Sequence, residues 1–133
     1  MTADTSVVIP LMVASHDAHA DAIAATSDVH RIPAHVLLEA IAVLTRLPAG
    51  LAVEAAQAVR VLNGRFPEPP LAIGSPDYAD LTSALAAGRM RGGEVYDALI
   101  AMTAKSAGAV LLTRDRRAET TYRAIGVESR YLN

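Results

Sequence analysis

The sequence VYDALIAMTAKSAGAVLLTRD, at positions 95–115, decides the fold class. Val95–Ala107 is long and apolar enough to predict a buried helix, and Ala109–Thr113 is a short apolar run typical of a buried strand. A helix that alternates with a strand is the repeating unit of α/β proteins, in which helices cover a mainly parallel sheet. This stretch therefore predicts an α/β fold, with Asp97 inside the helix and Asp115 just after the strand.

The same alternation continues on both sides of that stretch. Further strands are predicted at Met1–Asp4, His30–Pro33, Pro70–Ile73 and Val127–Tyr131, which gives a central parallel sheet of about five strands. Further helices are predicted at Asp17–Thr26, Val36–Leu47, Val53–Leu62, Asp77–Ala87 and Arg116–Ile125. Ligands of such sheets bind beyond the carboxyl ends of the strands, so functional residues are expected just after strands.

Composition limits the classes of protein to consider. The chain has 133 residues, 52% of them hydrophobic, and we expect one compact domain over residues 1–133. The absence of cysteine excludes disulfides, thiolate zinc sites and a cysteine nucleophile. The N-terminal residues have no basic leader, and no apolar run approaches the roughly 20 residues of a membrane span. We therefore expect a soluble protein located in the cytoplasm.

The charged residues give a weaker indication of a partner. The formal net charge is −2, which is unlike a protein that binds nucleic acid through bulk positive charge. Lys105 is the only lysine among the 12 cations, and this arginine bias suits bidentate contact with phosphate, although high-GC coding produces the same bias. With four Tyr and one Phe, base stacking is expected to be a minor theme.

Four acidic residues stand in apolar surroundings. Asp4 ends the first predicted strand and Glu39 is the only charge in Val36–Leu44, while Asp97 and Asp115 occupy the places described above. A helix that is apolar on all sides is buried, and a buried carboxylate must be protonated, ion-paired or bound to a metal. A shared site for divalent cations explains all four at once. Oxygen ligands favour Mg²⁺ or Mn²⁺, which promote attack of an activated water on a phosphodiester.

Other interpretations of the same acids remain open. Asp4 begins the capping sequence Asp-Thr-Ser, and Asp115 can cap the helix that follows it. Glu39 can be held by a salt bridge. Glu94, three residues before Asp97, either joins the acids or is favoured at the first turn by the helix dipole.

At these residues the sequence resembles the PIN-domain ribonucleases, and within them the VapC toxins of bacterial VapBC toxin–antitoxin pairs, most like those of mycobacteria. The resemblance rests on Asp4-Thr5-Ser6-Val7, on Glu39 in the helix after the second strand, on Tyr96–Ala101 and on Leu112–Asp115. It covers nearly the whole chain, including Ala118–Gly126 and the closing strand.

The resemblance implies a PIN-like α/β/α sandwich and a Mg²⁺- or Mn²⁺-dependent endoribonuclease that cleaves structured RNA such as tRNA or rRNA. It implies that Asp4, Glu39, Asp97 and Asp115 are the catalytic and metal-binding residues, and that Ser6 and Thr113 orient a water or a carboxylate. The implied partners are a VapB-type antitoxin, RNA and a second copy of the chain, in a heterotetramer or larger assembly with the antitoxin. The apolar run Leu11–Val13 suggests a partner surface.

Three arginines around the last acid are candidates for RNA contact. Arg114, Arg116 and Arg117 are predicted to line the mouth of the acidic pocket and to hold RNA phosphates, against the alternative of a solvated charge cluster. A phosphatase with an Asp-x-Asp nucleophile motif would require an acid where this chain has Ser6. A PIN-like RNA-binding module without catalysis typically shows substitutions among the four acids, and none is substituted here.

Overall fold

A short parallel sheet joins the first residues of the chain to its last third. The computed structural model describes residues 1–133 and places strand β2 (Leu111–Thr113) between β1 (Thr2–Ala3) and β3 (Ser129–Tyr131). Both neighbours of β2 run parallel to it, with Thr2 opposite Leu111 and Leu111 opposite Ser129. The predicted parallel α/β architecture is therefore confirmed, and Asp4 follows β1 directly.

The predicted number of strands is wrong, because three strands form instead of about five. The two other predicted segments, His30–Pro33 and Pro70–Ile73, run beside each other and are joined by an isolated parallel bridge between Pro33 and Leu71. The amide of Leu71 also donates to the carbonyl oxygen of Ile32 over 2.9 Å. Proline has no N–H to donate, so the prolines within and beside both segments keep this pairing from growing into a continuous ladder.

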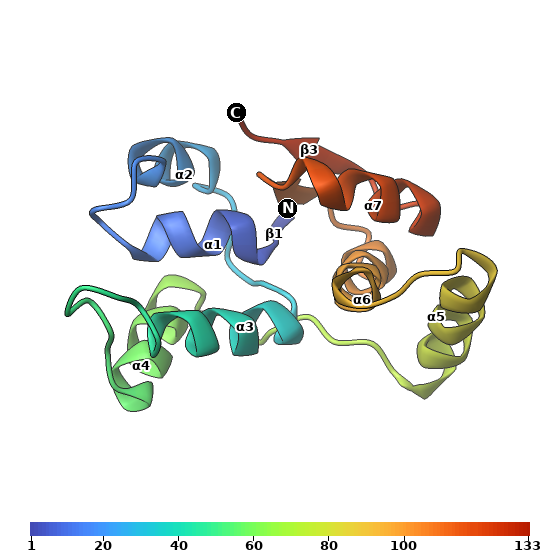
Figure 1. Cartoon of the computed structure of the whole chain (residues 1–133), viewed down its shortest axis with the longest axis horizontal. Coiled ribbons are helices and arrows are strands. Elements are labelled where there is room, and N and C mark those ends of the chain that lie inside the picture. The colour runs from blue at the N-terminus through green and yellow to red at the C-terminus, as the bar shows by residue number, and fades with distance from the viewer.

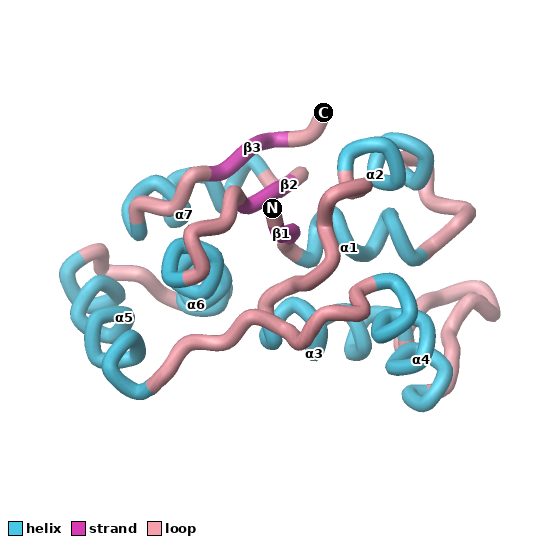
Figure 2. The backbone as a smooth tube through the Cα atoms, turned by 180° about the vertical axis from the view of Figure 1, so that it is seen from behind, coloured by secondary structure: helices cyan, strands magenta, loops and turns pink.

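Helices surround the sheet on two sides (Figure 1). Helices α1 to α4 lie on one side of β1, and α5 to α7 lie on the other, as the view from behind also shows (Figure 2). The helices are α1 (Thr5–Met12), α2 (His19–Ala25), α3 (Ala34–Leu44), α4 (Ala55–Arg65), α5 (Ser75–Ala87), α6 (Gly93–Ser106) and α7 (Glu119–Ile125), with a short 3-10 helix, η1 (Arg116–Ala118), before α7. No helix has the length and apolar character needed to cross a membrane.

Helix α1 was not among the predicted helices. Its sequence contains the β-branched run Val7-Val8-Ile9 followed by Pro10, which lowers intrinsic helix propensity. Tertiary packing overrides that propensity, because α1 packs against α2, α3 and β2, and Val7 and Val8 are fully buried. This helix holds Asp4 at its N-terminal end, so the missed element is the one that positions the first acid.

Candidate active site

Asp4 is the most buried of the four acids. Only 3% of the residue is exposed, and it follows β1 as the N-cap of α1. Its Oδ1 accepts a hydrogen bond from the Ser6 amide at 3.0 Å and another from the Ser6 hydroxyl at 2.5 Å. The capping interpretation and the buried-acid interpretation of Asp4 therefore both hold, because one oxygen caps the helix and the other faces the protein interior.

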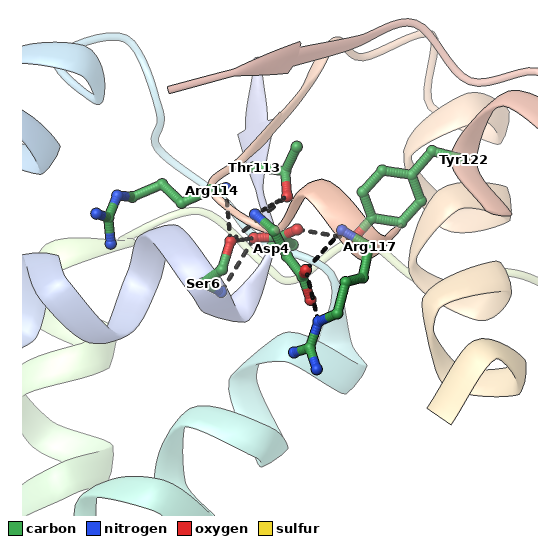
Figure 3. Close-up of polar contacts among 7 residues, drawn as sticks. Asp4, Ser6, Thr113, Arg114, Arg117 and Tyr122 are labelled. Carbon is green, nitrogen blue, oxygen red and sulfur yellow. Dashed lines mark hydrogen bonds and ion pairs between the residues drawn. The ribbon is translucent and has the colours of Figure 1, made fainter. Parts of the chain in front are cut away.

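Tyr122 binds that second oxygen and was missed by the sequence analysis. Its hydroxyl donates to Asp4 Oδ2 over 2.7 Å, and the residue is 1% exposed on α7 (Figure 3). Burial raises the pKa of Tyr122 well above its usual range, and the adjacent carboxylate of Asp4 adds to the rise, so the phenol stays a donor. Tyr122 lies three residues before Ile125 and four after Ala118 on a buried helix face, and a buried tyrosine hydroxyl needs a partner.

Ser6 connects the end of β1 to the end of β2. Its hydroxyl oxygen accepts a hydrogen bond from the Arg114 amide at 2.7 Å and lies 3.4 Å from the Thr113 hydroxyl, as Figure 3 shows. The Thr113 hydroxyl in turn accepts from the Asp115 amide at 3.0 Å. Ser6 and Thr113 thus fix the relative positions of Asp4 and Asp115, which are separated by more than a hundred residues in the sequence.

Two opposing effects act on the ionisation of Asp4. Burial raises the pKa of this carboxyl, since the charged form loses its hydration, whereas hydrogen bonds from Ser6, Thr113 and Tyr122 favour the charged form and lower it. Burial is the larger effect, so the pKa of Asp4 lies above its usual value. A cation close to Asp4 would remove this penalty.

Asp97 extends from α6 toward the same region and is half-buried. Burial, which is the largest cause, and the charges of Asp115, Asp4 and Glu39 together raise its pKa to about 6, while the charge of Arg117 opposes the rise. Asp97 thus lies within electrostatic range of the other three acids. The pKa of Asp97 therefore depends on the charges of all three other acids.

Glu39 departs from the expectation that it is buried. Its side chain is 38% exposed and its neighbour Leu38 is 64% exposed, because α3 packs against α1, α4 and α6 on one side only. The Glu39 Oε1 atom accepts a hydrogen bond from the Thr5 hydroxyl at 2.8 Å and lies 3.7 Å from His35 Nε2. The apolar sequence around Glu39 thus reflects an exposed apolar face of α3 as well as core packing.

Asp115 caps η1 and also faces the acids. Its Oδ1 accepts from the Arg117 amide at 2.9 Å and lies 3.3 Å from Arg117 Nε. Arg116 instead lies over the Tyr131 ring, with its guanidinium carbon 3.6 Å from the ring centroid, and pairs with Glu119 at 3.4 Å. Asp115 is therefore both a cap and a member of the acidic cluster.

The three arginines predicted for RNA contact take different directions. Arg117 lines the open cavity beside the acids. The Arg114 side chain extends away from Asp4 on the other side, as Figure 3 shows, and the ring contact of Arg116 directs it toward β3. Arg91, which the sequence analysis did not single out, lines the cavity with Arg117. Arg91 lies in the loop between α5 and α6, beside Gly92-Gly93, and nothing in the local sequence indicates that its side chain faces the acids.

Two adjoining cavities hold the four acids. The inner cavity, of about 150 Å³, is lined by Asp4, Glu39, Asp97 and Asp115, together with Thr5, Ser6, Ile100 and Tyr122. The outer cavity, of about 560 Å³, shares Glu39, Asp97 and Asp115 with it and is open to solvent. Glu94 lines only the outer cavity. The structure thus brings together all four acids that were predicted from the sequence.

The donor set suits a hard divalent cation that keeps part of its water shell. All the acidic donors are carboxylate oxygens, and no cysteine is present. No three acidic or histidine side chains are close enough together to hold one ion among themselves. Mg²⁺ typically binds through one or two carboxylates and completes its shell with water and substrate phosphate. The cluster has this character, and it differs from a closed, all-protein metal cage.

The family match and the similar proteins of known name agree with one another. Residues 1–124 match the family described as PIN domain. The chain is 45% identical over 130 residues to Ribonuclease VapC27 of Mycobacterium tuberculosis, an alignment that covers 96% of this chain and 93% of the relative. It is 40% identical over 130 residues to Ribonuclease VapC40 of the same species, with 94% of this chain and 93% of the relative covered.

Proposed function

The chain belongs to the PIN-domain family and to its VapC ribonucleases, and we propose that it is the toxin of a type II toxin–antitoxin pair that cleaves RNA with the help of a divalent cation. The observation that carries this proposal is the convergence of four carboxylates, from four distant segments, on one cavity. A structural role alone would not require four acids around one cavity, three of which raise the pKa of the fourth, Asp97.

We propose Asp4 and Asp97 as the direct ligands of Mg²⁺ or Mn²⁺, with Glu39 and Asp115 acting directly or through water. Asp4 is the most rigidly held of the four, because Ser6 and Tyr122 fix both of its oxygens. Asp97 has no hydrogen-bond partner to release before it binds an ion. A bound cation of this kind would neutralise the cluster, activate water and stabilise the charge of the phosphodiester in the transition state.

The residues of the chain itself keep the site ordered for this reaction. Hydrogen bonds from Thr5 and Ser6 orient Glu39 and Asp4, so the carboxylates point into the cavity before substrate arrives. With a pKa of about 6, Asp97 is mostly ionised at pH 7.5 and is available to a cation. Arg117 and Arg91 offer positive charge to phosphates that approach through the outer cavity.

The proposed substrate is structured RNA such as tRNA or rRNA, and the proposed partner is a VapB-type antitoxin. A second, largely apolar groove supports a protein partner. It has a volume of about 420 Å³ and lies between α1, α2, α3 and α4, with Leu11, Met12, Ile23, Leu44, Val53 and Val61 among its lining residues. We place the antitoxin in this groove, away from the acids, and we retain a homodimer and a heterotetramer or larger complex as the proposed assemblies.

Controlled expression in bacteria tests the proposal. Wild-type chain should arrest growth and produce discrete cleavage sites in tRNA or rRNA, mapped by primer extension, whereas Asp97→Asn should do neither. Asp80→Asn, at an exposed position on α5, is the matched control and should behave like the wild type. Growth arrest by Asp97→Asn without RNA cleavage would contradict catalysis and indicate a module that only binds RNA.

A further inference from the structure

Beside the acids, an exposed tyrosine lies flat against a histidine, and this pair has no part in the function proposed so far. We propose that Tyr96 is a stacking platform for the base of an unpaired nucleotide adjacent to the scissile phosphate. The proposal rests on the ribonuclease function given above. It makes Tyr96 a residue that binds substrate and determines which RNA is accepted.

The geometry of the pair is that of a rigid platform. The rings of His35, from α3, and Tyr96, from α6, are separated by 4.8 Å between centroids and tilted by only 3°. His35 therefore covers one face of the Tyr96 ring and limits its rotation. Tyr96 is nevertheless 54% exposed. Leaving so much aromatic surface in water is unfavourable, and a flat apolar ligand would relieve that cost.

The platform is attached directly to the acidic cluster. Tyr96 precedes Asp97 in α6, and the other ring of the pair reaches Glu39, with His35 Nε2 at 3.7 Å from Glu39 Oε1. Tyr96 lines the outer cavity, which shares Glu39, Asp97 and Asp115 with the inner one. A base stacked on Tyr96 would therefore place its own sugar and phosphate next to the carboxylates.

The surroundings of Tyr96 favour a nucleotide over a protein partner. Tyr96 is the one hydrophobic residue among the ten that line the outer cavity, and the rest are polar, charged or glycine. A nucleotide matches this combination, because it presents one flat base together with anionic phosphates that Arg91 and Arg117 can bind. A protein segment would need a continuous apolar surface, such as the groove between α1 and α4 provides. The volume of about 560 Å³ lies in the range of small-ligand pockets.

Stacking on a protein ring also selects the state of the RNA. In a duplex both faces of a base are covered by its neighbours, so a base can meet Tyr96 only when it is unpaired or turned out of the stack. The site should therefore prefer loops and single-stranded ends over continuous helices. This preference does not depend on reading hydrogen bonds of a particular base, so sequence selectivity from Tyr96 alone should be modest.

Steady-state cleavage of a short RNA hairpin, cut in its loop, tests the platform. Tyr96→Leu should raise KM by about 5- to 100-fold with a smaller change in kcat, the range expected for loss of one base–aromatic stack. Tyr96→Phe and Tyr96→Trp should stay within about threefold of wild type because they keep an aromatic ring. Tyr78→Leu is the matched control, since Tyr78 is 47% exposed on α5 and lies outside both cavities, and it should leave KM unchanged.

Two further measurements separate stacking from other roles. An abasic nucleotide beside the cleaved bond should raise the KM of the wild type, because the Tyr96 ring then has no base to stack on. It should leave the KM of Tyr96→Leu almost unchanged, because that variant has already lost the ring. The chain has no tryptophan, so Tyr96→Trp combined with Asp97→Asn creates a unique fluorophore that the same hairpin should quench without being cleaved. This binding signal does not require activity, and it distinguishes failure of the platform from failure of the ribonuclease proposal.

Several results would overturn the inference. Unchanged KM for Tyr96→Leu would do so, as would equal sensitivity of wild type and Tyr96→Leu to the abasic site. A change in oligomeric state on Tyr96→Leu, measured by light scattering, would assign the exposed ring to contact with a second copy of the chain. Cleavage by the wild type with no fluorescence change in the tryptophan variant would place the substrate base elsewhere.

Discussion

Replacing Asp97 by asparagine should raise the free energy of unfolding of the metal-free protein at pH 7.5 while abolishing cleavage. The carboxylate accepts no hydrogen bond and shares a small cavity with three other acids, whose charges raise its pKa, whereas the charge of Arg117 lowers it. Asparagine has nearly the same shape and removes that charge. Stability and activity should therefore move in opposite directions.

The size of the effect follows from the pKa of Asp97. A rise from 3.8 to about 6 corresponds to about 3 kcal/mol, at about 1.4 kcal/mol for each pKa unit. The side chain is only half-buried, and solvent screening reduces this to about 1–2 kcal/mol. For a domain of this length the gain corresponds to a rise in melting temperature of roughly 3–8 °C.

The dependence on pH has a definite sign. Burial and the neighbouring acids raise the pKa of Asp97 above 3.8, so the folded protein holds this proton more tightly than the unfolded chain does. The penalty is absent below about pH 4, where the carboxyl is protonated in both states, and it is complete above about pH 6. The advantage of Asp97→Asn over the wild type should shrink between pH 7.5 and pH 5.

Thermal and urea unfolding of chelator-treated protein measure this difference. Asp80→Asn, on the exposed face of α5, is the control and should change stability by less than about 0.5 kcal/mol. A variant Asp97→Asn that is less stable than the wild type at pH 7.5 would mean that Asp97 makes a structural contact. An advantage that is equal at pH 5 and pH 7.5 would refute charge repulsion as its cause.

Other predictions concern the same cluster. Millimolar Mn²⁺ should raise the melting temperature of the wild type by several degrees and that of Asp97→Asn by clearly less, since the ion binds only the folded state; equal shifts in the two proteins would place the ion elsewhere. Tyr122→Phe removes the donor to Asp4 Oδ2 and should cost about 1–3 kcal/mol at pH 7.5 in urea unfolding, and an unchanged midpoint would contradict the importance of that bond. Ser6→Ala removes the hydroxyl shared by Asp4 and Arg114 and should destabilise by a similar amount, with Ser6→Thr tested for partial rescue.

The sequence predicts the site better than it predicts the sheet. Asp97 and Asp115 lie in a helix and after a strand whose signals are strong, because long apolar periodicity and short apolar runs are the most reliable local patterns. The predicted number of strands is wrong where prolines interrupt the pairing of His30–Pro33 with Pro70–Ile73. The local sequence pattern of one segment does not show whether the neighbouring segment offers the N–H donors that a continuous ladder needs. Helix α1 was missed for the opposite reason, because tertiary packing stabilises a helix that its β-branched residues and Pro10 disfavour.

Burial within the site could not be ranked from sequence alone. Glu39 interrupts the most apolar helix, yet its side chain is more exposed than that of Asp4, which follows a short strand and resembles an ordinary helix cap. Tyr122 contributes to the burial of Asp4, and its position against that carboxylate depends on how α7 packs against α6. An apolar sequence indicates that a segment avoids water somewhere, but only the tertiary structure decides which of its faces is covered.

RNA cleavage by purified, metal-stripped protein tests the central claim most directly. Cleavage of a tRNA or rRNA fragment should be absent without divalent cations, should appear on addition of Mg²⁺ or Mn²⁺ to the wild type, and should remain absent for Asp97→Asn under both conditions. Cleavage by the wild type that persists in excess chelator, or cleavage by Asp97→Asn at the wild-type rate, would contradict a ribonuclease centred on these four carboxylates.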